Sequence, residues 1–293
     1  MNANPTQRVL SSMRSHGVRC LLMGGQACVF YGAAEFSRDV DLALVADEEN
    51  LSRLSQALDE LQASVIAVPP FEAEFLDQGL AVHFRCSAPG VEGLRVDVMS
   101  VMRGVDDFQD LWERRTSIEV DGLVIDLLSL PDLVRAKKTQ RSKDWPMVRR
   151  LIEAHWFQNE SEATPERIDF WIHECRTAEL LIEIVRRFRS EAKARQSERA
   201  AIAVAFGGDL EAVERALEEE RNAIASQDKA YWLPLRKTLE ALRRRGREGE
   251  GEGEGERERE REREHCIWHC HLHCVAHCVA HCCLHLKVFP WLF

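Results

Sequence analysis

The chain has 293 residues, of which 45% are hydrophobic, and its formal net charge is −10. This length allows one large or two modest domains with real cores, and the acidic balance excludes a uniformly basic, nucleic-acid-binding surface. No run of roughly 18 apolar residues occurs, and residues 1–19 lack the apolar stretch of a signal peptide, so we expect no membrane span or secretion. Cysteines before the tail are scattered like buried thiols of a reducing cytoplasm: Cys20, Cys28, Cys86 and Cys175.

Residues 1–156 alternate short β-like runs with helical patterns. Apolar runs predict strands at residues 18–23, 40–45, 81–86, 94–99, 118–120 and 123–127. The turn Asp121-Gly122 makes the last two of them a β-hairpin. Helical spacing or a helix-starting proline predicts helices after Gly25, over 50–61, from Leu130 and from Pro146. The segment is therefore predicted to be an α+β domain with a short mixed β-sheet flanked by helices.

Residues 157–245 show helical periodicity throughout. Stripes of apolar residues at helical spacing lie within 168–175, 181–188, 210–224 and 232–242. Such stripes are usually packing faces, so they predict a small C-terminal helical bundle that packs against the first domain.

Residues 246–293 form a low-complexity tail. Glu alternates with Gly and then with Arg over 248–264, and His-Cys pairs follow every four residues from His265-Cys266 to His281-Cys282. A segment without an apolar face is expected to be disordered. On a helix, the repeated pairs could hold zinc or copper. However, a period of four drifts by about 40° per repeat, which favours no single closed site. Translation of a short nucleotide repeat is the interpretation we prefer.

The segment 21–44 carries a pattern that suggests chemistry. An apolar run ends in Gly24-Gly25, and after residues 26–38 a second apolar run contains Asp39 and Asp41. Glycines let the backbone approach a phosphate closely, and N–H groups at the start of a helix point toward it. Alternate residues of a strand project from one face, so the two carboxylates lie together. They repel each other by about 4 kcal/mol at an effective dielectric of 20. A divalent cation such as Mg²⁺ or Mn²⁺ removes that cost.

Asp97 is the best candidate for a third carboxylate. It lies in the middle of an apolar run, between Val96 and Val98, where a charge needs a partner. A neighbouring strand about 4.8 Å away would bring it beside Asp39 and Asp41 and complete a two-metal site. His83 and His16 are expected to be ordinary surface or packing histidines.

These residues resemble the signature of the DNA polymerase β-like nucleotidyltransferase superfamily: Gly-Gly or Gly-Ser, a gap, Asp-x-Asp, and a later Asp on a β-strand. The resemblance covers about residues 15–155. It is greatest to small bacterial nucleotidyltransferase-like proteins, including abortive-infection toxins and antibiotic nucleotidyltransferases, which often pair this domain with a helical one. It implies that Asp39, Asp41 and Asp97 are catalytic and bind metal, and that Gly24 and Gly25 hold a nucleoside triphosphate.

Two further stretches extend the resemblance. Ser37 fits the family's hydroxyl position, but Glu35 stands where many relatives have arginine, and Arg38 could take over part of that role. In the basic stretch 130–151, a lysine that contacts phosphates in relatives corresponds to Lys138, with Lys137 as the alternative. Arg141 and Lys143 could add positive charge there, and Asp144 could cap or orient this corner.

The resemblance implies transfer of a nucleoside monophosphate from a triphosphate to an acceptor hydroxyl on a small molecule, a tRNA or a protein. Asp97 would help to activate that hydroxyl as a base. One alternative is a catalytically silent member that binds or regulates a protein partner in a toxin–antitoxin system, although the three retained carboxylates argue against it. The other is a nucleic-acid-binding module, which the net acidity disfavours.

Overall fold

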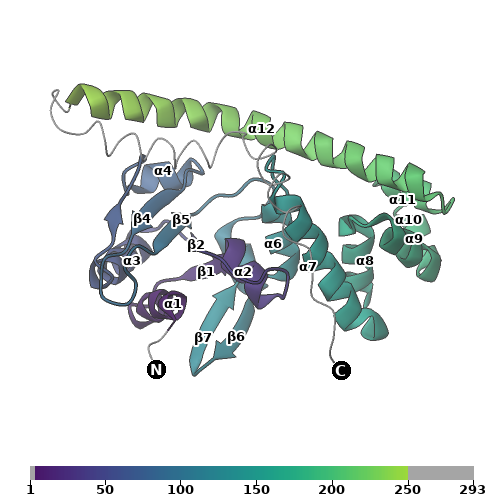
Figure 1. Cartoon of the computed structure of the whole chain (residues 1–293), viewed down its shortest axis with the longest axis horizontal. Coiled ribbons are helices and arrows are strands. Elements are labelled where there is room, and N and C mark those ends of the chain that lie inside the picture. Colours follow the sequence, from purple (N-terminus) through teal and green to yellow (C-terminus); the bar gives the residue numbers. More distant parts are fainter. Residues whose placement is uncertain (1–3, 250–293) are drawn as a thin grey trace, which may run out of the picture. The chain divides into compact units, whose positions relative to one another are not determined.

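The computed structural model describes residues 4–249, with side chains to residue 245. Seven strands form one sheet in the order β3-β4-β5-β2-β1-β7-β6 (Figure 1). The pairs β2–β5 and β1–β7 are parallel and the other four are antiparallel, so the mixed α/β character predicted from the sequence is confirmed. The strands are β1 (Cys20–Met23), β2 (Asp39–Leu44), β3 (Ser64–Val65), β4 (Val82–Arg85), β5 (Arg95–Met99), β6 (Thr116–Val120) and β7 (Leu123–Leu127).

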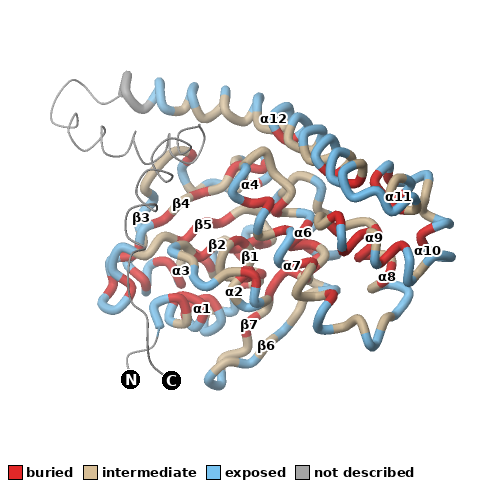
Figure 2. The backbone as a smooth tube through the Cα atoms, turned by 45° about the vertical axis from the view of Figure 1, so that its right-hand side comes forward, coloured by how far each residue is buried: buried red, intermediate tan, exposed pale blue. Residues whose placement is uncertain are grey.

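Alternation of apolar and polar residues gives β2 two different faces at its start. Val40 and Leu42 are buried, whereas Asp39 and Asp41 project the other way and are partly exposed. The central strands β1, β2 and β5 carry much of the buried core, which Figure 2 shows as red segments of the tube. All six predicted strands are present, and only the two-residue β3 was not predicted.

The predicted hairpin is confirmed at β6 and β7, which pair along their whole length. Asp121 and Gly122 have φ values of +52° and +79°. Both lie in the left-handed region that a two-residue hairpin turn requires, which explains why Asp-Gly occupies this position.

Helices of the first half pack on the sheet or on one another. All predicted helices there are found, and α7 begins two residues before the predicted proline. The structure adds α1, α4 and α5, and α1 begins with a capping box formed by Asn4 and Gln7. The helices are α1 (Pro5–Ser15), α2 (Gly24–Phe30), α3 (Glu48–Glu60), α4 (Ala73–Asp77), α5 (Phe108–Glu113), α6 (Leu130–Lys137) and α7 (Asp144–Asn159).

The segment after α7 is helical, as predicted. Trp156, Trp171 and Phe188 pack their rings together at its centre, with Trp156 and Trp171 crossing edge to face. The last two apolar stripes belong to one continuous helix, α12, which runs through Pro234. The elements are a 3₁₀ turn (Glu160–Glu162), α8 (Pro165–Glu174), α9 (Ala178–Arg187), α10 (Arg189–Ala194), α11 (Ala200–Ala205) and α12 (Leu210–Gly249).

The chain divides into two units at residue 243, and the sheet belongs to the first. The predicted division between residues 156 and 157 falls inside α7 and stays a prediction. The predicted disordered tail lies outside the described residues, except that α12 continues to Gly249. Among residues 4–249, no helix is both long and apolar enough to cross a bilayer.

Candidate active site

Two glycines at the start of α2 lie against the side chains that precede and form β2. Gly24 has a φ of +66°, and a Cβ built on it would lie 1.8 Å from Oδ2 of Asp41. A Cβ on Gly25 would lie 2.5 Å from Oγ of Ser37. The N–H of Gly25 donates a hydrogen bond to Oδ2 of Asp41 at 3.4 Å. A side chain at either glycine would collide with these groups, so the backbone can pass this close only because both residues are glycine.

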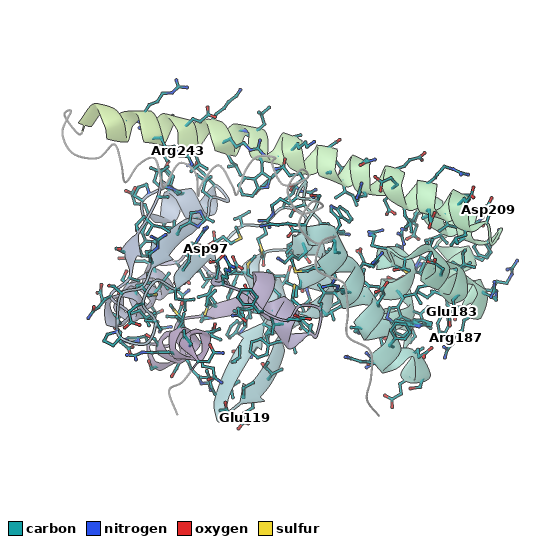
Figure 3. The ribbon with its side chains drawn as sticks, viewed as in Figure 1. Asp97, Glu119, Glu183, Arg187, Asp209 and Arg243 are labelled. Carbon is teal, nitrogen blue, oxygen red and sulfur yellow. The ribbon has the colours of Figure 1, made fainter. Side chains whose placement is uncertain are left out.

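The strand register brings the three predicted carboxylates onto one face of the sheet. Asp41 on β2 lies directly opposite Asp97 on β5, and Asp39 lies opposite Arg95. Asp97 is in turn opposite His83 on β4. Since alternate residues of a strand share a face, these five side chains lie on one face in two adjacent rows. One row contains His83, Asp97 and Asp41, and the other contains Arg95 and Asp39. Figure 3 labels Asp97 among the side chains drawn on the ribbon.

Asp41 is a partly buried carboxylate whose charge has little direct compensation. Burial raises its pKa, and the negative charges of Asp97 and Asp39 raise it further, while the positive charge of Lys137 opposes them. Within the described part of the chain, Asp41 accepts only the long hydrogen bond from Gly25 and forms no ion pair. The side chain of Asp39 forms no hydrogen bond or ion pair among those residues. Both carboxylates therefore lack a direct counter-charge.

Asp97 differs because its carboxylate is fully engaged. Arg95 donates from Nε to Oδ1 at 2.7 Å and from Nη2 to Oδ2 at 2.8 Å, the two-pronged geometry that a guanidinium favours. Nδ1 of His83 lies 2.9 Å from Oδ1 of Asp97 and 3.0 Å from Nη2 of Arg95. Burial would raise the pKa of Asp97, but the contacts with His83 and Arg95 outweigh it and hold that pKa below its usual range.

Neither Arg95 nor His83 was identified as a site residue from the sequence. His83 was expected to be a surface or packing histidine, whereas the structure places it against the carboxylate of Asp97. Arg95 is two residues before Asp97 on a predicted strand, and that spacing alone places both on one face. This signal was present in the sequence and could have revealed the pair.

The two adjacent lysines at the end of α6 point to different partners. Nζ of Lys138 binds both carboxylate oxygens of Glu174, at 2.8 and 2.9 Å. Lys137 is buried, its Nζ lies 3.9 Å from Oδ1 of Asp144, and its charge acts on Asp41. The structure therefore places the alternative lysine of the sequence prediction, Lys137, electrostatically nearer to the carboxylates.

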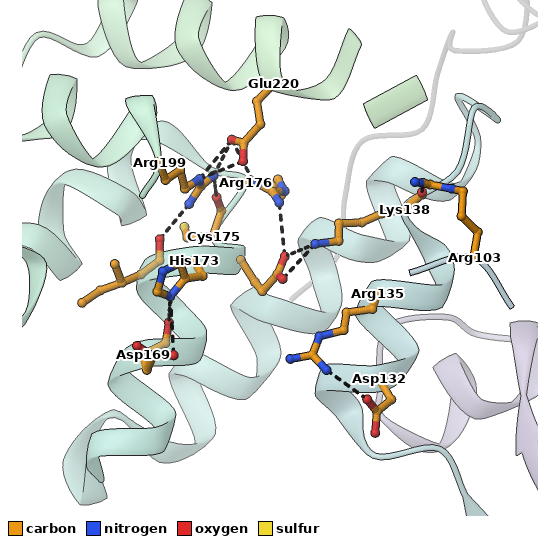
Figure 4. Close-up of polar contacts among 12 residues, drawn as sticks. Arg103, Asp132, Arg135, Lys138, Asp169, His173, Cys175, Arg176, Arg199 and Glu220 are labelled. Carbon is orange, nitrogen blue, oxygen red and sulfur yellow. Dashed lines mark hydrogen bonds and ion pairs between the residues drawn. The ribbon is translucent and has the colours of Figure 1, made fainter. Parts of the chain in front are cut away.

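Lys138 instead joins a cluster of ion pairs in the helical region, which we call the helical ion cluster (Figure 4). Glu174 also accepts from Arg176 at 3.2 Å. Arg176 and the buried Arg199 both donate to Glu220 on α12, at 3.0 to 3.1 Å. The cluster comprises Lys138, Glu174, Arg176, Arg199 and Glu220.

The remaining predicted residues lie around these groups. Oγ of Ser37 donates to the backbone oxygen of Asp39 at 3.2 Å, which fixes the entry into β2. Glu35 and Arg38 are exposed, and the guanidinium of Arg38 lies 5.7 Å from the ring centre of Phe36. Asp144 is buried and accepts from Thr139 and Arg141, so it orders the basic loop after α6, as suggested from the sequence.

Two of the cysteines in the described part of the chain, Cys20 and Cys175, offer no nucleophile for this site. Burial, aided by the charge of Asp126, raises the pKa of Cys20 to about 12, and burial raises that of Cys175 to about 11. A thiol must ionise to attack, so both are inert near neutral pH.

The carboxylates fit one divalent cation better than two. Among residues 4–249, no group of three His, Cys, Asp or Glu side chains is arranged to hold a metal ion. The uncompensated pair Asp39 and Asp41 is nevertheless the kind of donor set that Mg²⁺ accepts, with water and phosphate oxygens completing its coordination. Asp97 does not fit in the same way, because Arg95 occupies both of its oxygens.

Comparisons with known proteins add little to this geometry. No protein-family model matches the chain, and no curated protein matches it. Among solved structures, the crystal structure of an antigenic nucleotidyltransferase-like protein from Paracoccidioides brasiliensis covers 59% of this chain and 94% of its own, at 17% identity and a TM-score of 0.32. A likeness of this size carries no argument about function, which has to be inferred from the residues of the site.

Proposed function

We propose that the protein is a metal-dependent nucleotidyltransferase, which moves a nucleoside monophosphate from a nucleoside triphosphate to an acceptor hydroxyl. The observation that carries the proposal is geometric: Asp39 and Asp41 share one face of β2, Asp41 lies opposite Asp97 on β5, and the backbone of Gly24 lies against the carboxylate of Asp41. Holding like charges together in a folded protein costs free energy, and unrelieved groups of this kind are typical of functional sites. A cation with a phosphate ligand would relieve that cost.

Each residue of the proposed site has a defined task. Asp39 and Asp41 would hold Mg²⁺ or Mn²⁺, which when bound stabilises the negative charge on the reacting phosphate. The backbone of Gly24 and Gly25, which lies against Asp41 and Ser37, would hold the triphosphate through N–H groups at the start of α2. Lys137 supplies a buried positive charge near the same carboxylate and would attract the phosphates. Lys138, the first choice from the sequence, stays a prediction for that role.

The acceptor would be a small molecule, a tRNA or a protein. Transfer requires a hydroxyl oriented in line with the α-phosphate, and orientation alone contributes a large part of such rate enhancements. We expect the acceptor to approach the carboxylate face of the sheet, because the apolar residues Val40 and Leu42 close the opposite face.

The test uses Asp39→Asn and Asp41→Asn, with Glu119→Gln as a matched control on the exposed hairpin. The protein is incubated with Mg²⁺, each of the four triphosphates labelled at the α-phosphate, and a cell lysate that supplies acceptors. Wild type and the control should label a product, and both Asn variants should lose about 10³-fold or more of the transfer rate. Transfer unchanged in both Asn variants would remove these residues from the mechanism.

A second candidate is a catalytically silent protein that binds or regulates a partner, as in a toxin–antitoxin system. One observation favours it: Arg95 engages the carboxylate of Asp97, which the resemblance assigns to catalysis. Calorimetry with Mg²⁺ and each triphosphate separates the candidates. Binding that is lost in Asp41→Asn supports the enzyme, whereas no binding by a folded wild type supports the silent protein.

A further inference from the structure

Arg95 is positioned to neutralise one of the three carboxylates permanently. It lies on β5 opposite Asp39 and two residues before Asp97, so its guanidinium shares the face of all three aspartates. The side chains of Arg95 and Asp97 are 16% and 12% exposed, which protects their two hydrogen bonds from water. Burial would lower the pKa of Arg95, but Asp97, Asp39 and Asp41 together raise it. The guanidinium therefore stays charged.

We propose that the site binds a single divalent cation, at Asp39 and Asp41, and that Arg95 supplies at Asp97 the positive charge of a second one. The inference rests on the proposed function and deepens it. Three carboxylates less the charge of Arg95 leave two negative charges, which one divalent cation neutralises. Lys137 adds positive charge nearby, but among the described residues its ammonium forms an ion pair with Asp144 and not with Asp39 or Asp41.

The geometry at Asp97 explains why a second cation is excluded. To ligate a metal ion, Asp97 would have to share oxygens that already accept charge-assisted hydrogen bonds from Nε and Nη2 of Arg95, beside the positive charge of that guanidinium. His83 blocks the same carboxylate from β4, with Nδ1 2.9 Å from Oδ1. Removing Arg95 would restore a third uncompensated carboxylate. Arg95 is thus a positioning residue, which keeps Asp97 out of the metal's coordination shell.

The experiment counts bound Mn²⁺ by equilibrium dialysis of the full chain. Dialysis is done with a saturating triphosphate analogue that carries a non-hydrolysable α–β bridge, in both chambers. The count for the double variant Asp39→Asn/Asp41→Asn is subtracted, so that ions bound elsewhere on the chain do not contribute. Wild type should bind one site-dependent ion and Arg95→Ala should bind two. Arg85→Ala is the matched control, because Arg85 lies opposite Arg95 on β4 and is exposed, and it should bind one.

A second variant makes the test independent of whether Arg95→Ala folds, since that substitution leaves Asp97 without its partner. The double variant Arg95→Ala/Asp97→Asn removes the pair together and should bind one ion, because the third carboxylate is gone. Two ions in wild type would overturn the inference and restore Asp97 as a ligand, while leaving the proposed function intact. One ion in a folded Arg95→Ala would also overturn it. No site-dependent ion in wild type would overturn both the inference and the proposed function.

Discussion

Two groups of charged side chains are partly buried in the described part of this protein, and they differ in how completely their carboxylates are paired with cations. In the helical ion cluster, Glu174 binds Lys138 and Arg176, and Glu220 binds Arg176 and Arg199. On the sheet, three carboxylates share one face and only Asp97 has an ion-pair partner that is always cationic, Arg95. Matched charges hold elements together, whereas Asp39 and Asp41 are left for something the chain itself does not provide.

The pKa shifts of one carboxylate from each group, Glu220 and Asp41, have opposite directions. Burial would raise the pKa of Glu220, but Arg199 and Arg176 hold it below its usual range. The pKa of Asp41 moves upward, since burial and two like charges outweigh Lys137. A carboxylate whose ionised form the fold stabilises already has its partners, whereas a carboxylate whose ionised form the fold destabilises is a candidate for binding a ligand. This contrast separates two clusters that look alike in composition.

The largest effect is expected from adding a side chain at Gly24, whose backbone lies against Asp41. Gly24→Ala places a Cβ 1.8 Å from Oδ2 of Asp41 at a φ of +66°, so the carboxylate must move. We expect transfer to fall by about 10³-fold, equivalent to roughly 4 kcal/mol of activation free energy. Gly32→Ala is the matched control, because Gly32 has a φ of +74° and nothing within 4 Å of the added Cβ.

Both alanines introduce comparable backbone strain, of order 1–3 kcal/mol. Thermal unfolding should therefore shift downward in both variants, whereas label transfer should be lost only in Gly24→Ala. Equal transfer rates in the two variants would show that proximity of the backbone to Asp41 is unimportant for the reaction.

Much of this arrangement could be predicted from the sequence because it depends on short-range patterns. Alternation and apolar runs placed the central strands, Asp121-Gly122 placed the hairpin, and the Asp39-x-Asp41 spacing fixed one face of β2. The strand around Asp97 was also predictable. Its alignment opposite Asp41 depends on a five-residue register between β2 and β5, which no local pattern specifies.

Contacts between distant segments account for most of what was missed. The pairing of Arg95 with Asp97 is local and could have been found from the spacing, but the contact of His83 with the same carboxylate comes from another strand. Lys137 and Lys138 differ by one position on α6, about 100° of rotation, and only tertiary packing decides which side each faces. The last two apolar stripes merge into α12 although Pro234 lies between them, since the helix can continue where the proline clash is tolerated.

An intermediate effect is expected from replacing the two adjacent lysines. Lys137 lies near the carboxylates of the sheet, and Lys138 belongs to the helical ion cluster. Lys137→Met should lower kcat/KM for the triphosphate by about 10-fold, or roughly 1.4 kcal/mol, because its charge acts near Asp41. Lys138→Met should leave kcat/KM within about threefold and instead lower stability, since it removes the partner of Glu174. Steady-state kinetics and thermal unfolding on both variants measure this. A larger kinetic loss in Lys138→Met would favour the sequence's first choice for the phosphate contact.

The smallest effect concerns the pH dependence of stability in metal-free buffer. The pKa of Glu220 is lower in the folded than in the unfolded chain, so its contribution to stability is present above pH of about 4.5 and is lost as the pH falls through the folded value. The pKa of Asp41 is raised, so its ionisation opposes folding above its folded pKa. That opposition disappears as the pH falls toward about 4, the usual range of an aspartate.

Unfolding temperatures of wild type, Glu220→Gln and Asp41→Asn, measured at several pH values with a chelator, separate these two signs. Asp41→Asn should be more stable than wild type at pH 7, and the gap should close on mild acidification. Glu220→Gln should be less stable at pH 7, and its gap should close only below about pH 4.5. Each gap should be at most about 1 kcal/mol, because both sites are partly solvated. If Asp41→Asn were less stable than wild type at pH 7, the carboxylates on the sheet would be matched charges like those between the helices, and the distinction between the two regions would fail.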